Sequence, residues 1–190
     1  MVKVVVVNGA PTSGKTTFEE ICFDMCRPHN HIKGFTSENN LWVKITSTVE
    51  FVKEIAEHCG WDGSKTLKNR KFLSDLKDLL TEWNDIPFKK IKEVADALAT
   101  KRNGVDWILF VDCREPAEIQ KLKERLNATT ILIRRESVES NEVSNHADAE
   151  VFNYTYDLTI ENNSDIIGLE KKAKDFINYM RGRPHYEHDN

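Results

Sequence analysis

The sequence begins with an unbroken valine run, Val4 to Val7, and a glycine-rich segment, Gly9 to Thr16, follows it almost at once. A strand built only from branched apolar residues has to be covered on both faces, as in a parallel sheet. The segment after it reads Gly-Ala-Pro-Thr-Ser-Gly-Lys-Thr. This is the pattern of a phosphate-binding loop, which needs a strand before it and a helix after it. The pattern predicts an α/β fold whose first strand ends at an anion site.

Each position of this loop has a chemical role. The glycines let the backbone pass close to an anion, and the amides from Thr12 to Thr17 then point inward at the positive end of the next helix. Lys15 is expected to bridge the β- and γ-phosphates, and the Thr16 hydroxyl is expected to bind Mg²⁺. The expected cofactors are therefore ATP and Mg²⁺, and the residues predicted to bind them are Gly9, Ala10, Thr12, Ser13, Gly14, Lys15, Thr16 and Thr17.

The composition is that of one globular domain. A chain of 190 residues is long enough for one buried core and too short for two ordinary domains. A formal charge of -4 and the lack of a basic stripe argue against nucleic acid as a partner. No apolar run has the length of a membrane span, and the N-terminus does not resemble a signal sequence. We expect a cytoplasmic monomer or homodimer that binds no membrane.

The four cysteines form neither a CxxC pair nor a disulfide framework. Cys22 and Cys26 are one helical turn apart, and His29 and His31 follow them, which makes a zinc site conceivable. Pro28 fits the end of a helix better, and small buried cysteines without a metal are commoner. The sequence therefore favours apolar cysteines over a zinc site.

Apolar periodicity and turn residues divide the chain into alternating strands and helices. The expected strands are residues 2–7, 107–111, 129–133 and 156–160, and residues 41–45 form a further short apolar stretch. The expected helices are residues 14–26, 65–84, 87–102, 116–126 and 165–180, and another helix is expected to end at Cys59 and Gly60. This alternation predicts a P-loop three-layer sandwich of about five parallel strands with helices on both faces.

Local signals refine two of these helices. Ser47 and Glu50 have the spacing of a capping box, which predicts the start of the helix before Gly60. In the helix at 65–84, apolar residues recur at helical spacing and predict a packed face, formed by Phe72, Leu73, Leu76, Leu79, Leu80 and Trp83.

The predicted domain covers residues 1–180 and has two specialised parts. The segment from about 30 to 102 holds more helix than a simple crossover needs, and we interpret it as an acceptor-binding insert. The polar, acidic stretch within residues 134–150 resembles a mobile lid. Residues 181–190 are polar and are predicted to form a loose tail.

Charged residues follow two of the expected strands. Asp112 closes an apolar strand, so its carboxylate is expected at the carboxyl edge of the sheet, where it can hold Mg²⁺ opposite Thr16. Arg114 is placed to reach an acceptor phosphate, and Glu115 fits an acidic cap on the next helix.

A pair of arginines, Arg134 and Arg135, follows the strand at 129–133. Guanidinium groups suit phosphate oxygens, and two of them on a loop at the same sheet edge can close over the group in transfer. The predicted catalytic residues are thus Lys15, Asp112, Arg134 and Arg135, with a solvated charge pair as the alternative for the two arginines.

A constrained turn, Gly60-Trp61-Asp62-Gly63-Ser64-Lys65, precedes Arg70. Lys65 and Arg70 are candidates to bind a second anionic substrate. A structural turn with a packing tryptophan explains the two glycines equally well, so both interpretations stand.

Together these motifs resemble the P-loop nucleoside monophosphate kinase group, and most closely its phage-type deoxynucleoside monophosphate kinases, which are related to animal-type phosphomevalonate kinase. The residues that carry the resemblance are 9–16, 60–65 with Arg70, 112–116, Arg134-Arg135, 146–150 and 156–163. The chain departs from the family at Asp148-Ala149, where a serine is usual before Glu150. The resemblance implies the donor chemistry more strongly than the identity of the acceptor, since residues 30–58 match no family pattern.

The expected function is transfer of the γ-phosphoryl of ATP to a small phosphorylated acceptor, first of all a nucleoside monophosphate. A phosphate is already an anionic nucleophile at neutral pH and needs no general base. One alternative keeps the reaction and changes the acceptor, to dephospho-coenzyme A or a phosphomevalonate-like ester. A second alternative is a nucleotide-binding regulatory ATPase or switch with little turnover.

Overall fold

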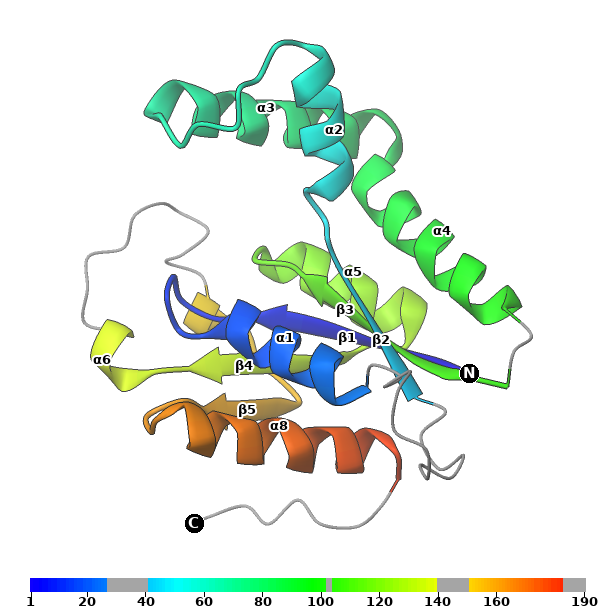
Figure 1. The fold of residues 1–190 in the computed structure, drawn as a ribbon. Coiled ribbons are helices and arrows are strands. Elements are labelled where there is room, and N and C mark those ends of the chain that lie inside the picture. Colours follow the sequence, from blue (N-terminus) through cyan, green and yellow to red (C-terminus); the bar gives the residue numbers. More distant parts are fainter. Residues whose placement is uncertain (27–40, 102–103, 140–150, 183–190) are drawn as a thin grey trace.

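A five-stranded parallel sheet forms the centre of the protein (Figure 1). The computed structural model describes residues 1–26, 41–101, 104–139 and 151–182. The strands are β1 (Val2–Asn8), β2 (Leu41–Ser47), β3 (Asp106–Asp112), β4 (Thr129–Arg134) and β5 (Leu158–Glu161), and their order across the sheet is β2-β3-β1-β4-β5. Every neighbouring pair is parallel. The predicted α/β sandwich is confirmed.

The sheet is covered on both faces, as the valine run requires. Val5 and Val7 face α1 (Lys15–Cys26) and α8 (Ile166–Met180), together with buried residues such as Phe18 and Phe176. Val4 and Val6 face the opposite layer, which contains α4 (Ile86–Thr100) and α5 (Pro116–Leu126). Successive residues from Val4 to Val7 thus serve two different cores, and these four positions leave no place for a polar side chain.

The edge strand β2 was not predicted as a strand. Residues 41–45 were recognised only as an apolar stretch, whereas the structure pairs β2 with β3 along its whole length, from Leu41 beside Asp106 to Ser47 beside Asp112. An edge strand is less uniformly buried, and Lys44 in its middle is exposed, which weakens the sequence signal. The range 30–102 predicted for the insert therefore includes one strand of the central sheet.

The helices α2 (Glu50–His58) and α3 (Leu67–Asn84) lead from β2 to α4, which packs against the sheet (Figure 1). Two short elements, α6 (Glu136–Glu139) and a 3-10 helix at Val151–Asn153, complete the described structure. The turn before α3 is ordered by Asp62, whose Oδ1 accepts hydrogen bonds from the Ser64 amide at 2.9 Å and from Asn69 Nδ2 at 2.6 Å. Most of the predicted helices match within two residues at each end.

Two local predictions were wrong. The capping box does not form, because Ser47 is the last residue of β2. The N-cap residue of α2 is Val49, whose side chain makes no cap hydrogen bond. The Glu50 carboxylate instead accepts a hydrogen bond from the Thr46 hydroxyl. The apolar face of α3 is not fully packed either. Trp83 is 80% exposed and Leu79 61% exposed, since α3 contacts the neighbouring helices along only part of its surface.

Three aromatic rings in the core between the sheet and the helices α1 and α8 give a test of the packing. Phe18 is fully buried, and its ring centroid lies 5.5 Å from that of Phe176 and 6.3 Å from that of Phe110. Phe18→Ala should lower the free energy of unfolding by about 3–5 kcal/mol, because it leaves a cavity among these rings. Phe23→Ala in the same helix, at an exposed position, should cost less than about 1 kcal/mol in the same urea titration. Equal losses in the two variants would contradict this packing.

Candidate active site

The phosphate-binding loop is held at its start by a buried asparagine. Asn8 ends β1, and its Oδ1 accepts a hydrogen bond from the Gly9 amide at 2.8 Å. Its Nδ2 donates to the Arg114 carbonyl at 3.2 Å and to the Tyr156 hydroxyl at 2.7 Å. The Tyr156 hydroxyl donates in turn to the Val151 carbonyl at 2.8 Å. This single side chain therefore joins the loop to the segment after β3 and to the segment before β5.

The two glycines of the loop lie where no side chain fits. A Cβ at Gly9 would stand 2.3 Å from the Ile133 carbonyl oxygen, and a Cβ at Gly14 would stand 2.3 Å from Asn162 Nδ2. Gly14 also has a φ of +100°, which other residues rarely adopt. Asn162, just after β5, donates a hydrogen bond from this Nδ2 to the Ser13 carbonyl at 2.9 Å. The loop is thus braced from behind by β4 and by the residue that follows β5.

The charged head of Lys15 curls back over the loop. Its Nζ donates to the Gly9 carbonyl at 2.6 Å and to the Ala10 carbonyl at 3.0 Å. These bonds keep the ammonium group above the loop, where an anion held by the amides would meet it.

A cavity of about 990 Å³ opens beside the loop. The predicted site residues that line it are Thr12, Gly14, Lys15, Thr16, Thr17, Lys65, Asp112, Arg114 and Arg135. They come from three parts of the chain: the loop itself, the carboxyl ends of β3 and β4, and the turn before α3. The cavity therefore joins the phosphate loop to the helical insert.

Sheet register explains this convergence. Asp112, the last residue of β3, lies beside Val7 of β1 on one side and beside Ser47 of β2 on the other. Because the carboxyl ends of parallel strands share one edge, the residues that follow these strands meet at the cavity. Ser47 and Thr48, which the sequence did not indicate as site residues, also line it for this reason.

The predicted metal ligands Thr16 and Asp112 both line the cavity. Burial raises the pKa of Asp112, and the positive charges of Lys15, Arg114 and Lys53 oppose this effect. A hydroxyl and a carboxylate beside a phosphate site fit Mg²⁺, which takes one or two protein oxygens together with substrate phosphates and water. Among the described residues no group of three or more His, Cys, Asp or Glu side chains is arranged as a self-contained metal site.

The zinc alternative gains no support from the described residues. Cys22 and Cys26 are buried in the core, and burial raises the pKa of both thiols, which favours their neutral form. His29 and His31 lie outside the described residues. The two cysteines pack as apolar side chains.

A buried glutamate, Glu19, was missed by the sequence analysis. It is almost fully buried in α1, and its pKa is raised to about 8, chiefly by burial and then by the negative charge of Asp112, with Lys15 acting in the opposite direction. Its Oε1 has no hydrogen-bond partner among the described residues. Glu19 follows Lys15 by one helical turn, so helical spacing was the available signal.

Several predicted residues do not reach the cavity. Arg134 ends β4, where its guanidinium lies 3.9 Å from the Glu161 carboxylate across the strand pair. Arg70 donates from Nε to the Lys65 carbonyl at 3.2 Å and so braces the turn before α3. Of the two adjacent arginines, only Arg135 lines the cavity. The rest of the predicted lid, residues 140–150, lies outside the described residues.

Four further charged side chains that line the cavity had no predicted binding role: Lys53, Lys77, Glu115 and Asp165. Lys53 lies on α2 and Lys77 on α3, and both resemble ordinary surface lysines in the sequence. Glu115 stands at the N-cap position of α5, but its side chain forms no cap hydrogen bond. No local pattern distinguishes the two lysines, because the insert brings them to the cavity only after it has folded.

Known proteins resemble this chain in structure rather than in sequence. No family model matches the sequence, and no curated protein matches it. The fold is similar to that of a sugar kinase from Janibacter sp. HTCC2649, with a TM-score of 0.51 and 13% identity over 98% of this chain and 100% of that chain. The protein has the fold of the P-loop kinases.

A shikimate kinase from Bacteroides thetaiotaomicron aligns with a TM-score of 0.43 and 10% identity over 94% of this chain and 98% of its own. That value is too low to support an argument. The P-loop kinase fold at such low identity carries no information on the acceptor, so the resemblance to phage-type deoxynucleoside monophosphate kinases stays a prediction. In the described ranges no helix is both long and apolar enough to cross a membrane.

Replacing Glu19 should change how stability depends on pH in the nucleotide-free protein. The pKa is about 8 in the folded chain and near 4.5 in the unfolded chain, so the folded state holds an extra proton between these values. The stability due to this group is complete below the lower pKa and is lost as pH rises, by up to ~1.4 kcal/mol per pH unit. In Glu19→Gln this part of the decline should disappear, while the part due to Asp112 remains.

Urea unfolding between pH 5 and 8.5 would measure the effect. Glu20→Gln is the matched control, since Glu20 is exposed on the same helix. If wild type and Glu19→Gln lose stability equally across this range, the raised pKa is wrong.

Proposed function

We propose that the protein is a phosphotransferase that moves the γ-phosphoryl group of ATP to a small phosphorylated acceptor, first of all a deoxynucleoside or ribonucleoside monophosphate. One observation supports this most strongly: a single cavity is lined both by the phosphate loop and by lysines of the helical insert. A reaction between two bound substrates requires such a shared cavity, because the reacting atoms have to meet.

The charges of the cavity suit an acceptor that carries a phosphate. Beyond Lys15, the cations that line it are Lys53, Lys65, Arg114 and Arg135, together with Lys77, which is paired with Glu115 and Glu118. Arg114 and Lys65 come from the acceptor side that the sequence predicted. Arginine presents paired donors that match phosphate oxygens, and lysine adds a point charge.

The acidic residues of the cavity argue against an alcohol acceptor, which would need a carboxylate as general base. Asp112 is placed to serve the metal, and Asp165 accepts a hydrogen bond from the Gly168 amide at 2.9 Å as the cap of α8. Glu115 is paired with Lys77 at 2.6 Å. The carboxyl end of β2 supplies Ser47 and Thr48 rather than an acid. Among the described residues, the acidic side chains that line the cavity are Asp112, Glu115 and Asp165, and each of the three has another role.

In the proposed reaction the chain supplies positioning and charge. The loop amides and Lys15 hold the phosphates of ATP, and Arg114 and Arg135 neutralise charge on the group in transfer and on the acceptor. Thr16 and Asp112 would hold Mg²⁺, which when bound supplies further neutralisation of the phosphate oxygens. The buried, largely neutral Glu19 below Lys15 adds no negative charge at neutral pH, so the field at the loop stays positive.

Two alternatives share parts of this site. Another phosphate ester, such as a dephospho-coenzyme A or phosphomevalonate-like acceptor, would use the same cations. A nucleotide-binding switch would use the loop but has no need of lysines at the far end of the cavity, which is why the kinase is preferred.

The proposal is tested by incubating purified protein with Mg-ATP and each of the common nucleoside and deoxynucleoside monophosphates, and by following ADP formation. We expect ADP only when an acceptor is present. Lys15→Ala should lower turnover by roughly a thousandfold or more, because it removes a charge that acts on the transferring group. Circular dichroism should show an unchanged fold.

Acceptor-independent ATP hydrolysis, or no ADP with any nucleotide or phosphate ester, would rule out the kinase. Nucleotide binding without turnover would favour the switch.

Lys65 allows the acceptor end to be tested separately. Lys65→Ala should raise the KM for the acceptor about tenfold and leave the KM for ATP within twofold, because one charge-assisted contact to the acceptor is lost. Lys71→Ala is the matched control, since Lys71 is an exposed lysine of the following helix that pairs with Asp75 at 2.7 Å. An equal rise in the KM for ATP would place Lys65 outside the acceptor end.

A further inference from the structure

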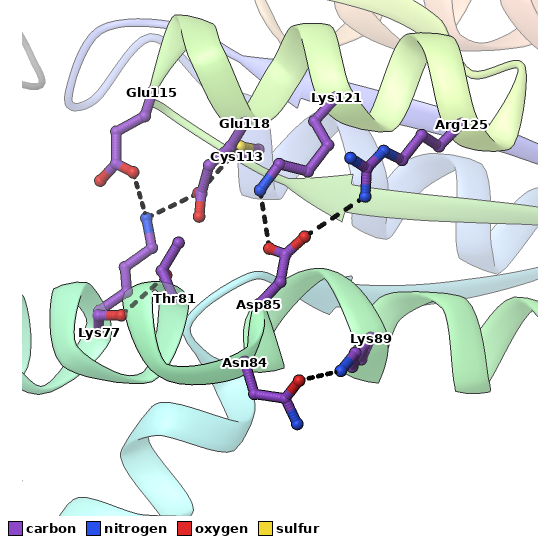
Figure 2. Close-up of polar contacts among 10 residues, drawn as sticks. All are labelled: Lys77, Thr81, Asn84, Asp85, Lys89, Cys113, Glu115, Glu118, Lys121 and Arg125. Carbon is purple, nitrogen blue, oxygen red and sulfur yellow. Dashed lines mark hydrogen bonds and ion pairs between the residues drawn. The ribbon is translucent and has the colours of Figure 1, made fainter.

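The helix α3 buries only one of its 18 side chains, and that side chain is a lysine. Lys77 is 8% exposed, and its Nζ lies 2.6 Å from Glu115 Oε2 and 2.7 Å from Glu118 Oε2 (Figure 2). Burial alone would lower the pKa of Lys77, but the two carboxylates outweigh it and hold the pKa above its ordinary value. Lys77 is therefore a permanent cation between α3 and the start of α5.

A role in attaching α3 to α5 does not by itself explain why the buried residue at position 77 is a lysine. Replacing a buried ion pair by apolar residues of similar size is often neutral or stabilising, so an apolar side chain would serve a purely structural role at least as well. A second group of ion pairs already joins the insert to α5: Asp85, at the α3–α4 junction, lies 2.7 Å from Lys121 and 3.6 Å from Arg125 (Figure 2).

The two groups of ion pairs differ in where they lie. Lys77 and Glu115 line the large cavity, whereas Asp85, Lys121 and Arg125 do not. Glu118 stands behind them, 13% exposed, and accepts a contact from the Cys113 thiol at 3.6 Å. Only the first group is therefore in a position to meet a substrate.

The first group has two carboxyl groups and one ammonium, and burial raises the pKa of Glu118, the less exposed of the two. Glu115 is the more open of the two, with 41% of its side chain exposed. The backbone position of Glu115 is fixed because it is the N-cap residue of α5, and its carboxylate is held by the ion pair with Lys77. A carboxylate at the wall of a cavity otherwise rich in lysine and arginine repels the phosphate of an acceptor. It is suited instead to a part of the acceptor that carries hydrogen-bond donors.

We infer that Glu115 is a specificity-determining residue of the acceptor site, held in place by Lys77 as a positioning residue, and that it binds a hydrogen-bond donor on the acceptor beyond its phosphate. The amino or ring N–H groups of a nucleobase are donors of this kind. Half-buried Leu73, one turn before Lys77 on the same side of α3, also lines the cavity and offers an apolar contact for a base. This inference rests on the proposed function and narrows its acceptor to a nucleotide.

The test is Glu115→Gln, which keeps the shape of the side chain and removes its charge. No helix cap is lost, because the side chain caps no amide. The kinetic constants are measured with Mg-ATP and dAMP, dCMP, dGMP and dTMP. We expect the KM of the best nucleotide to rise roughly tenfold or more, the KM for ATP to stay within twofold, and the preference among the four bases to narrow.

Lys77→Met should act in the same direction, because Glu115 loses the group that positions it. Glu124→Gln is the matched control: it makes the same substitution on α5 at an exposed position and should leave all constants within twofold. Thermal unfolding of each variant separates loss of fold from loss of recognition.

The outcomes are distinct. If Glu115→Gln leaves the acceptor KM within twofold in an active enzyme, or lowers kcat/KM for all four nucleotides by one common factor, the inference is overturned and the proposed kinase stands. If wild-type protein phosphorylates none of the nucleotides, the nucleotide acceptor is overturned together with this inference.

Discussion

The fit of the phosphate loop against its neighbours is the constraint on which the site depends. Backbone at Ile133 and the side-chain amide of Asn162 approach the loop so closely that Gly9 and Gly14 have no room for a Cβ. The loop therefore takes its shape only when β1, β4 and β5 are assembled in register. Anion binding by backbone amides needs this rigidity, because amides that point at one centre repel each other without support.

Positively charged side chains line the cavity although the chain as a whole is negatively charged. The protein has a formal charge of -4, yet lysines and arginines from the loop, the insert and the end of β4 line one cavity. Low-dielectric walls concentrate the field of such charges, so local placement outweighs net charge. The acids in this region have other partners or surroundings: Glu115 is paired with Lys77, Asp165 caps α8, and burial raises the pKa of Glu19 and Asp112.

Features that depend on neighbours in sequence were predicted well. The loop, the alternation of strands and helices and the placement of Asp112 at the end of a strand all follow from local periodicity and fixed spacing. The capping box at Ser47 was wrong because pairing of β2 with β3 extends that strand through Ser47 and outweighs a preference of about 1 kcal/mol. Trp83 was predicted to pack, since helical spacing shows that a face exists but not that a partner covers it.

By itself, the sequence determined the fold class and the position of the glycine-rich loop, because the valine run requires a strand covered on both faces and the glycine pattern fits a tight turn between that strand and a helix. Only the tertiary structure decided which cations serve the cavity. Arg134 and Arg135 are adjacent in sequence, but β-sheet pairing turns the first toward Glu161, while the second lies past the strand at the cavity. Lys77 and Glu115 meet across 38 residues of chain, and no local pattern encodes that contact. Which side chains reach the cavity depends on strand register and helix packing, and these form only when distant parts of the chain come together.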